Sequence, residues 1–441
     1  MKSIRIIYSV LFVTLTFLWL LADNFFSTSF EFFPLRSSLV NYTGVLAMGA
    51  MSVAMILALR PFAIESLLNG MDKSYRLHKW LGITALVVSV IHWLWAVVPK
   101  WLVGWAMLAK PAGGARVDRS QFVEWMTSQR SLAEALGEWA FYATVVLILL
   151  ALIKRFPYRH FFKTHRVLAI VYLILVYHSI ILMKSEYWLS ALGMVMALLM
   201  VLGSIAAILS LTGAIGYKKR AVGTIDELDY YQDNRVLRVV VHLRDRWVHH
   251  QAGQFAFATF DSKEGAHPFT LSSSWNPDGR LSFLIKELGD YTRTLPSVLK
   301  SGQAVTIEGP YGCFDFSGPQ QRQIWIAGGI GITPFMARMQ ALIVQPDGCT
   351  IDLWYSTAEP ASDFIERLTQ LAEQAGVRLH VLITERDCRL TTDKLCAEVP
   401  DWRDASLWFC GPGAFGRALR EGLVERGFDK QYFHQELFDM R

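Results

Sequence analysis

Four histidines in the apolar first half of the chain are the residues best placed to do chemistry. His78 and His92 share one hydrophobic stretch, and His165 and His178 share another, with separations of 14 and 13 residues. On a helix that rises about 1.5 Å per residue, each separation spans roughly 20 Å, which is much of a hydrocarbon core about 30 Å thick. An ionisable ring inside a membrane segment is unfavourable and is usually functional.

The matched pairs predict a metal-binding role. A single buried histidine is more often a hydrogen-bonded polar group than a ligand, but bis-histidine haem ligation needs one ring from each of two helices at each of two depths. Because the third and fifth spans run in the same direction, we expect His78 to pair with His165 near the inner side. His92 then pairs with His178 near the outer side. The four residues are predicted to be axial ligands of two b-type haems.

The 13-residue separation does not fit an ideal helix. A spacing of 14 residues falls about 40° short of four turns, whereas 13 residues miss a whole number of turns by about 140°. Either a local irregularity such as a π-bulge re-aims one ring, or His160, five turns before His178, is the ligand. We retain His165, because His160 is expected to lie outside the bilayer, and keep His160 as the alternative.

Six apolar segments are near the length of about 20 residues that a spanning helix needs. The expected spans are residues 6–22, 40–59, 77–98, 135–153, 167–183 and 188–215. A signal peptide is an alternative for the first segment, but Ala22-Asp23-Asn24 lacks a small-x-small cleavage site. We therefore interpret it as a retained helix, so that both termini lie on one side of the membrane.

Basic residues fix the orientation. They flank the spans on the side that carries both termini, which indicates the cytoplasm; they are Lys2, Arg5, Arg60, Lys73, Arg76, Lys79, Lys154, Arg155, Arg159, Lys163, Lys218, Lys219 and Arg220. The net charge of +5 comes largely from these flanks and argues against nucleic-acid binding. We expect an integral protein of a bacterial inner membrane, surrounded by lipid, with the segment 99–134 outside.

The second half of the chain has the pattern of cytosolic domains. All five cysteines lie beyond residue 300, which indicates a reducing compartment, and none has zinc or iron–sulfur spacing. Short apolar runs predict an antiparallel β-barrel over residues 218–320. From residue 321 to 441, strands alternate with helices and predict a parallel α/β nucleotide-binding domain. With a six-helix transmembrane bundle over 1–217, the expected fold class is a multidomain membrane protein.

A glycine-rich turn follows the first strand of the α/β domain. The segment Gly328-Gly-Ile-Gly-Ile-Thr-Pro334 could let a pyrophosphate approach the backbone at a helix N-terminus. Its glycines do not spell the Rossmann fingerprint, so tight-turn packing is the alternative.

Five ordered motifs give the chain a resemblance to a known family. They are His267-Pro-Phe-Thr-Leu-Ser-Ser273, Leu284-Ile-Lys-Glu-Leu-Gly-Asp-Tyr-Thr292, Gly309-Pro-Tyr-Gly312, the 328–334 turn and Cys410-Gly-Pro412. The second half resembles the ferredoxin-NADP reductase superfamily, and the whole chain resembles the NADPH oxidase and ferric reductase family. The resemblance implies an FAD-binding barrel and an NAD(P)H-binding domain, so NADPH or NADH is the expected donor.

The resemblance also implies roles for residues of the barrel. Thr270 would bond the isoalloxazine edge of FAD, with His267 and Phe269 lining the flavin, and Lys286 to Thr292 would contact the diphosphate. The implied FAD-binding residues are His267, Pro268, Phe269, Thr270, Ser272, Lys286, Gly289, Thr292, Gly309 and Gly312.

For the nucleotide domain, Cys410 is implied to lie beside the nicotinamide, although a small buried thiol is the alternative. Phe438 is at the place where the family often lays an aromatic ring over the flavin. The implied NAD(P)H-binding residues are Gly328, Gly329, Gly331, Thr333, Pro334, Cys410, Gly411 and Pro412. A 2′-phosphate needs Arg or Lys after a strand, but Tyr355-Ser-Thr-Ala offers none, though Arg386 could reach it.

These assignments predict an electron path. A hydride carries two electrons and a haem accepts one, so FAD is expected between NAD(P)H and the two haems. The acceptor on the outer side stays open: O₂ giving superoxide is favoured, and a ferric chelate or a periplasmic protein are the alternatives. The basic segment with Trp101, Trp105 and Trp125 could attract an anionic chelate, or only lie at the membrane interface.

Overall fold

The structure is a computed structural model, and it describes residues 2–23, 25, 31–109, 121–153, 155–245 and 247–436. The chain divides into two compact units, with the boundary between Ile215 and Gly216. The first unit is helical. The second contains an antiparallel sheet followed by a parallel one.

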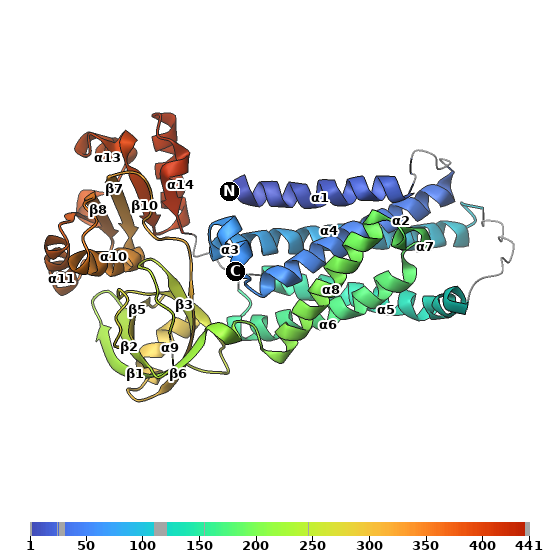
Figure 1. Ribbon diagram of the computed structural model, residues 1–441, viewed down its shortest axis with the longest axis horizontal. Coiled ribbons are helices and arrows are strands. Elements are labelled where there is room, and N and C mark those ends of the chain that lie inside the picture. Colours follow the sequence, from blue (N-terminus) through green and yellow to red (C-terminus); the bar gives the residue numbers. More distant parts are fainter. Residues whose placement is uncertain are drawn as a thin grey trace. The chain divides into compact units, whose positions relative to one another are not determined.

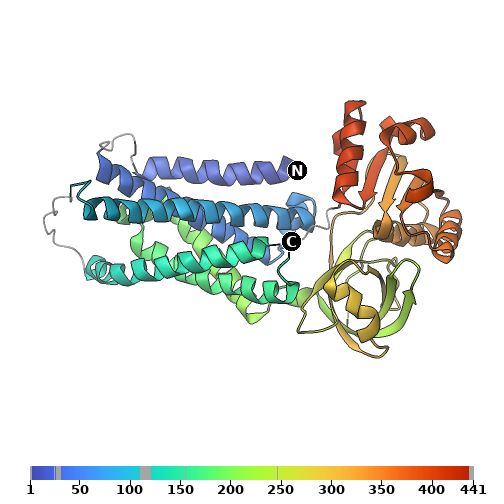
Figure 2. The ribbon, with the colours of Figure 1, turned by 180° about the vertical axis from the view of Figure 1, so that it is seen from behind.

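Six described helices are long and apolar enough to cross a membrane, which confirms the predicted number. They are α1 (Lys2–Asp23), α2 (Phe32–Ala58), α4 (Met71–Gly104), α5 (Gln121–Leu152), α6 (Tyr158–Leu182) and α8 (Ala191–Thr212). Both ribbon views show them side by side in one bundle (Figures 1 and 2). Two short helices, α3 (Phe62–Leu68) and α7 (Ser185–Trp188), also belong to the described part of this unit.

The start of the last span differs from the prediction. Trp188 ends the short helix α7, and the spanning helix α8 begins only at Ala191. The Ser190 side chain accepts a hydrogen bond from the Gly193 N–H, which satisfies a free donor of the first turn and fixes the beginning of α8. The apolar run that starts at Trp188 is therefore divided between two helices.

The proline inside α4 frees a backbone carbonyl, which explains why an arginine side chain lies within the bundle. Pro99 lies in the helix and has no N–H, so the carbonyl of Trp95 loses its usual helical partner. Arg36 of α2 replaces it: its Nε donates to the Trp95 carbonyl at 3.0 Å and its Nη2 donates to the Ala96 carbonyl at 2.9 Å. The guanidinium thus joins α2 to α4 a few residues beyond His92.

We expect Arg36→Ala to destabilise the bundle by about 2 kcal/mol, since hydrogen bonds to a charged group each contribute about 1.5–3 kcal/mol. Thermal unfolding of the full chain in detergent measures the loss. In the Pro99→Ala background the Trp95 carbonyl regains an N–H partner, so the same Arg36→Ala change should be less destabilising there. Equal losses in the two backgrounds would show that Arg36 acts by some other contact.

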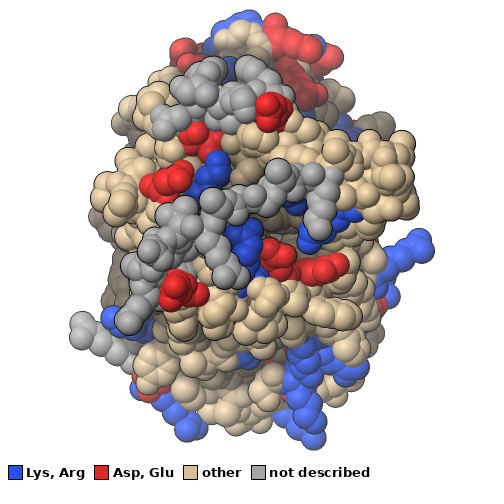
Figure 3. Space-filling view, turned by 90° about the vertical axis from the view of Figure 1, so that its right-hand side faces the viewer, with Lys and Arg blue, Asp and Glu red and all other residues tan. Residues whose placement is uncertain are grey.

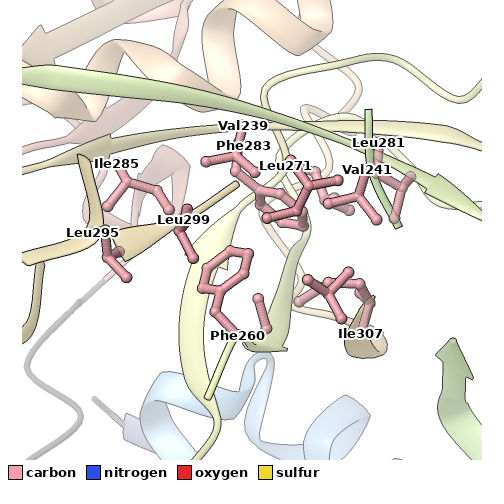
Figure 4. Close-up of a cluster of buried hydrophobic side chains, with 14 of the residues drawn as sticks. Val239, Val241, Phe260, Leu271, Leu281, Phe283, Ile285, Leu295, Leu299 and Ile307 are labelled. Atoms are coloured by element: carbon pink, nitrogen blue, oxygen red, sulfur yellow. The ribbon is translucent and has the colours of Figure 1, made fainter. Parts of the chain in front are cut away.

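The second unit begins with six antiparallel strands: β1 (Arg220–Tyr231), β2 (Val236–Leu243), β3 (Phe255–Thr259), β4 (His267–Thr270), β5 (Arg280–Lys286) and β6 (Ala304–Tyr311). Their order is β4-β3-β6-β1-β2-β5. The end strands β4 and β5 meet through a bridge between Leu271 and Phe283, so the sheet closes into the predicted barrel. Val239, Val241, Leu271, Phe283 and Ile307 fill its interior (Figure 4).

One helix packs with the barrel and a parallel sheet follows it. Helix α9 (Asp290–Val298) comes after β5. The parallel strands are β7 (Arg322–Gly328), β8 (Thr350–Thr357), β9 (Arg378–Ile383), β10 (Ser406–Cys410) and β11 (Phe433–Gln435), in the order β11-β10-β7-β8-β9. The helices between them are α10 (Thr333–Val344), α11 (Ser362–Gln374), α12 (Thr384–Asp387), α13 (Thr392–Glu398) and α14 (Gly413–Glu425). The order reverses at β7, so the turns after β7 and β10 meet where such sheets bind ligands.

Candidate functional site

The bundle brings the four histidines together in two pairs. The ring centroids of His78 in α4 and His165 in α6 are 5.8 Å apart, with an angle of 65° between the ring planes. Those of His92 and His178 are 6.3 Å apart, at 76°. Each pair joins α4 to α6, and the two pairs lie at different depths along the same two helices.

Hydrogen bonds fix the tautomer of three of these rings. The Nδ1 of His78 lies 2.9 Å from the Ala54 carbonyl, that of His92 lies 3.0 Å from the Val40 carbonyl, and that of His178 lies 2.8 Å from the Ala133 carbonyl. A carbonyl only accepts, so each Nδ1 carries the proton and donates it. Each Nε2 then keeps an unshared electron pair that can bind a metal.

His165 is held differently. Its ring stacks on Phe161, with centroids 5.1 Å apart and 24° between the planes, and its buried Nδ1 has no hydrogen-bond partner among the described residues. The inner pair therefore has one ring oriented by a hydrogen bond, whereas both rings of the outer pair are oriented in this way.

The 13-residue spacing in α6 is accommodated without a π-bulge. Helix α6 is α-helical from Tyr158 to Leu182, and His160 is exposed in its first turn. His178 lies against Gly137 of α5, where a Cβ would come within 2.0 Å of the His178 Nδ1. The spacing rotates His178 toward α5, and the missing side chain at Gly137 leaves room for the ring.

The predicted flavin strand is β4 of the barrel. The His267 ring stacks on Tyr291 of α9, with centroids 4.2 Å apart and 20° between the planes, while Thr270 and Ser272 are buried. Burial lowers the pKa of His267 to about 4, so the imidazole is neutral at pH 7. Phe269, beyond Pro268, packs against the barrel core.

Tyr291 belongs to a motif noted in the sequence but was not singled out there. Burial raises the pKa of its phenol, and the hydroxyl has no hydrogen-bond partner among the described residues. A buried hydroxyl without a partner is expected beside a ligand. The only sequence signal was its place between Gly289 and Thr292.

The predicted diphosphate segment separates into two parts. Thr292 Oγ1 accepts hydrogen bonds from the N–H groups of Leu288 and Gly289, both at 3.0 Å, and so fixes the turn into α9. Lys286, at the end of β5, places its Nζ 2.6 Å from Oε2 of Glu359, which follows β8. The ammonium is thus directed to the nucleotide domain, an arrangement that the sequence did not predict.

The glycines of the two turns allow close backbone approach. A Cβ on Gly331 would lie 2.2 Å from the Cys410 carbonyl oxygen, so the turn after β7 and the turn after β10 touch through backbone alone. Gly328 and Gly329 precede this contact, Thr333 and Pro334 begin α10, and Gly411 and Pro412 follow β10. Gly309 and Gly312 lie at the end of β6, on the barrel side.

Cys410 ends β10 and is fully buried. Desolvation raises the pKa of its thiol well above the usual range, so the sulfur is uncharged at pH 7. It pairs in parallel register with Ala327, next to Gly328, and therefore lies at the carboxyl edge of the sheet. Phe438, the aromatic residue predicted over the flavin, lies outside the described residues.

The end of the bundle seen in Figure 3 carries interspersed Lys, Arg, Asp and Glu side chains. Lys100 Nζ lies 3.9 Å and Arg130 Nε lies 3.1 Å from the Glu134 carboxylate, and Lys184 pairs with Asp23. The predicted tryptophans of this region are exposed: Trp101, Trp105 and Trp125. In the part of the segment that the structure describes, positive charges are thus balanced by carboxylates; Lys110, Arg116 and Arg119 lie outside it.

Comparisons with known proteins match both units. The family model "Ferric reductase like transmembrane component" matches residues 43–176, and the model "FAD-binding domain" matches residues 222–315. The first match contains His78, His92 and His165, and the second contains the segment from His267 to Thr292.

Curated relatives match part of the chain. A glycine betaine monooxygenase reductase subunit of Chromohalobacter salexigens is 24% identical over 193 residues, which are 40% of this chain and 52% of that protein. An NADPH oxidoreductase of Mycobacterium tuberculosis is 32% identical over 118 residues, 26% of this chain and 31% of its own length. Flavohemoprotein A of Dictyostelium discoideum is 27% identical over 34% of this chain and 39% of its own. The chain thus spans at most about half the length of these relatives.

Solved structures are more distant. The Amycolatopsis cytochrome P450 reductase GcoB aligns with 50% of this chain and 69% of its own, at 22% identity and a TM-score of 0.44. Likeness at that level carries no argument. The two family models show that a ferric reductase-like transmembrane domain is fused to an FAD-binding domain, which matches the architecture of the NADPH oxidase and ferric reductase family.

Proposed function

We propose that the protein transfers electrons from cytosolic NAD(P)H, through FAD and two b-type haems, to an acceptor on the outer side of the membrane, with O₂ as the favoured acceptor and superoxide as the product. The observation that carries this proposal is the pairing of four histidines between α4 and α6 at two depths. The barrel and the α/β domain support the flavin and the nucleotide.

The distances within the pairs fit a shared haem iron. If both rings of a pair bound one iron, two metal–nitrogen distances of about 2 Å, each extended by about 1 Å to the ring centre, would put the ring centroids roughly 6 Å apart. The observed separations of 5.8 and 6.3 Å agree with this value.

The chain's own residues hold the rings ready for such ligation. The carbonyls of Ala54, Val40 and Ala133 keep three Nδ1 protons in place and leave the electron pair of each Nε2 free. A hydrogen bond of this kind makes the imidazole a more basic ligand. His78 and His165 would bind the inner haem, and His92 and His178 the outer one.

In the second unit, the residues present fit a flavin and a dinucleotide. The stack of His267 on Tyr291 offers planar, neutral surfaces beside β4, and the touching turns at Gly331 and Cys410 give a side-chain-free edge. FAD, when bound, accepts hydride as an electron pair and releases electrons singly. The basic residues that flank the spans support a cytoplasmic position for this unit by the positive-inside rule.

Purified full-length protein in detergent tests the proposal. Its reduced absorbance spectrum should be that of low-spin b-type haem, with about two haems per chain. NADH or NADPH oxidation should occur without an added metal, and superoxide dismutase should abolish the accompanying reduction of cytochrome c. Protein without haem would end the proposal.

Ferric chelate reduction is the second candidate function, and the ferric reductase-like family match favours it. Nucleotide oxidation that requires an added ferric chelate would select it over the oxidase. A requirement for a co-purified protein would instead identify a periplasmic acceptor.

A further inference from the structure

The carboxyl edge of the parallel sheet contains a buried hydroxyl that lacks a partner. Ser356 pairs in register with Gly328, at the start of the glycine-rich turn. Its side chain is only 8% exposed, and among the described residues Oγ finds no hydrogen-bond partner. Buried hydroxyls are normally satisfied, so an unsatisfied one at this edge points to a ligand that supplies the hydrogen bond.

A carboxylate follows Ser356 at a fixed position. Thr357, the last residue of β8, accepts a hydrogen bond at Oγ1 from the Glu359 N–H at 3.2 Å and donates to the Glu359 carbonyl at 3.1 Å. This turn ties Glu359 to the end of the strand. When a dinucleotide lies across such an edge, an acidic residue after the second strand binds the hydroxyls of the adenosine ribose.

Two cations of the barrel orient the Glu359 carboxylate. Arg235 Nη2 lies 2.5 Å from Oε1, and Lys286 Nζ lies 2.6 Å from Oε2. These bonds lower the pKa of Glu359, so the group is negatively charged at pH 7. Each oxygen accepts one hydrogen bond and retains capacity for a second, such as one from a ribose hydroxyl.

The basic groups near this turn are already engaged. Residues 358–366 contain no Lys or Arg. Arg386, which could have reached a 2′-phosphate, donates two hydrogen bonds to Asp387 at 2.9 and 3.0 Å, while Arg235 and Lys286 are bound to Glu359. Arg235 and Lys286 keep their positive charges in these ion pairs, so the selection against a 2′-phosphate lies in the Glu359 oxygens themselves. They can accept a hydrogen bond from a ribose hydroxyl, whereas an ionised phosphate has no proton to donate to them.

We propose that the electron donor is NADH, with Ser356 and Glu359 binding the adenosine ribose and Glu359 excluding the 2′-phosphate of NADPH. This inference rests on the proposed function, because it assumes that the edge binds a pyridine nucleotide. It adds the choice between the two nucleotides and names the residue that makes the choice.

Anaerobic reduction of bound FAD in the full-length protein tests the inference. Wild-type protein should be reduced by NADH with a kcat/KM at least about tenfold above that for NADPH, which corresponds to about 1.4 kcal/mol and is the size expected for the loss of one hydrogen bond to a charged group. Glu359→Gln should raise the value for NADPH and lower that for NADH, so that the preference nearly disappears. Glu373→Gln, which removes an exposed acid on α11, is the matched control and should keep the wild-type preference.

A binding measurement gives a second readout and covers the case in which Glu359→Gln does not fold. Titration of wild-type protein with 5′-AMP and with adenosine 2′,5′-bisphosphate should show at least about tenfold weaker binding of the 2′-phosphorylated compound. Ser356→Ala should weaken the binding of both compounds to a similar degree.

Three outcomes separate the inference from the function on which it rests. Equal or better use of NADPH by wild-type protein would overturn the choice of NADH. An unchanged preference in folded Glu359→Gln would overturn the role of Glu359. Failure of both nucleotides to reduce the flavin would instead overturn the proposed function.

Discussion

Replacing His92 by alanine should leave about one b-type haem per chain in place of two. The outer pair would keep only His178, and one axial imidazole cannot hold the low-spin bis-histidine geometry. The inner pair, His78 and His165, makes no contact through His92 and should remain loaded. The haem-to-protein ratio and the reduced spectrum of the purified variant measure this, and reduction of FAD by the nucleotide should persist while transfer to the outer acceptor is lost.

His160→Ala is the matched control for this experiment. His160 is exposed in the first turn of α6, so its loss should leave both haems in place. Two haems in His92→Ala, or one haem in His160→Ala, would show that the ligands are not the four histidines that face one another between α4 and α6.

Local patterns were sufficient to predict the elements and their order. Spans near the length of the hydrocarbon core predicted the six helices, and short apolar runs such as residues 238–243 predicted barrel strands. The direction of the third and fifth spans predicted which histidine would face which. Each of these signals lies within one segment or follows from counting the segments. These predictions therefore did not depend on how the helices and strands pack.

Contacts between distant segments could not be predicted in this way. The sequence suggested Lys286 as a diphosphate ligand, but nothing local indicated that Glu359, 73 residues further on, would bind its ammonium. Likewise the expected span ended at residue 98, whereas α4 continues through Pro99 to Gly104. Nothing local indicated that Arg36 would bond the Trp95 carbonyl freed by this proline. Charge, length and position in the fold select such partners, and only the folded arrangement shows them.

The 13-residue spacing illustrates the same limit. Helix geometry indicated that His165 and His178 should not share a face, and the two explanations drawn from α6 alone were a bulge and a different histidine. In the structure α6 has no bulge, His165 faces His78, and His178 lies against Gly137. Room for the His178 ring comes from Gly137 of the neighbouring helix α5. No sequence pattern identifies this glycine as a position that faces a histidine.

Gly137→Ala should therefore remove the outer haem, although the ligands themselves are unchanged. The added Cβ would lie 2.0 Å from Nδ1 and 2.4 Å from Cε1 of His178, far inside van der Waals contact. The ring is held by its hydrogen bond to the Ala133 carbonyl at 2.8 Å, so relieving the clash breaks that bond and moves the ring from its position opposite His92. We expect the haem-to-protein ratio to fall toward one, with loss of the signals of the outer haem in the reduced spectrum.

Two other glycines of the bundle separate this effect from a general effect on helices. Alanine is favoured over glycine inside a helix by roughly 0.8–1 kcal/mol, so the substitution should not weaken α5 itself. A Cβ added to Gly82 of α4 would have nothing within 4 Å, and one added to Gly44 would lie 3.4 Å from His92 Cε1, an ordinary contact. The haem-to-protein ratio should stay at about two in Gly82→Ala and should fall only slightly below two in Gly44→Ala. Two haems with an unaltered spectrum in Gly137→Ala would mean that α5 and α6 can separate at little cost, and that His178 does not depend on Gly137 for its position.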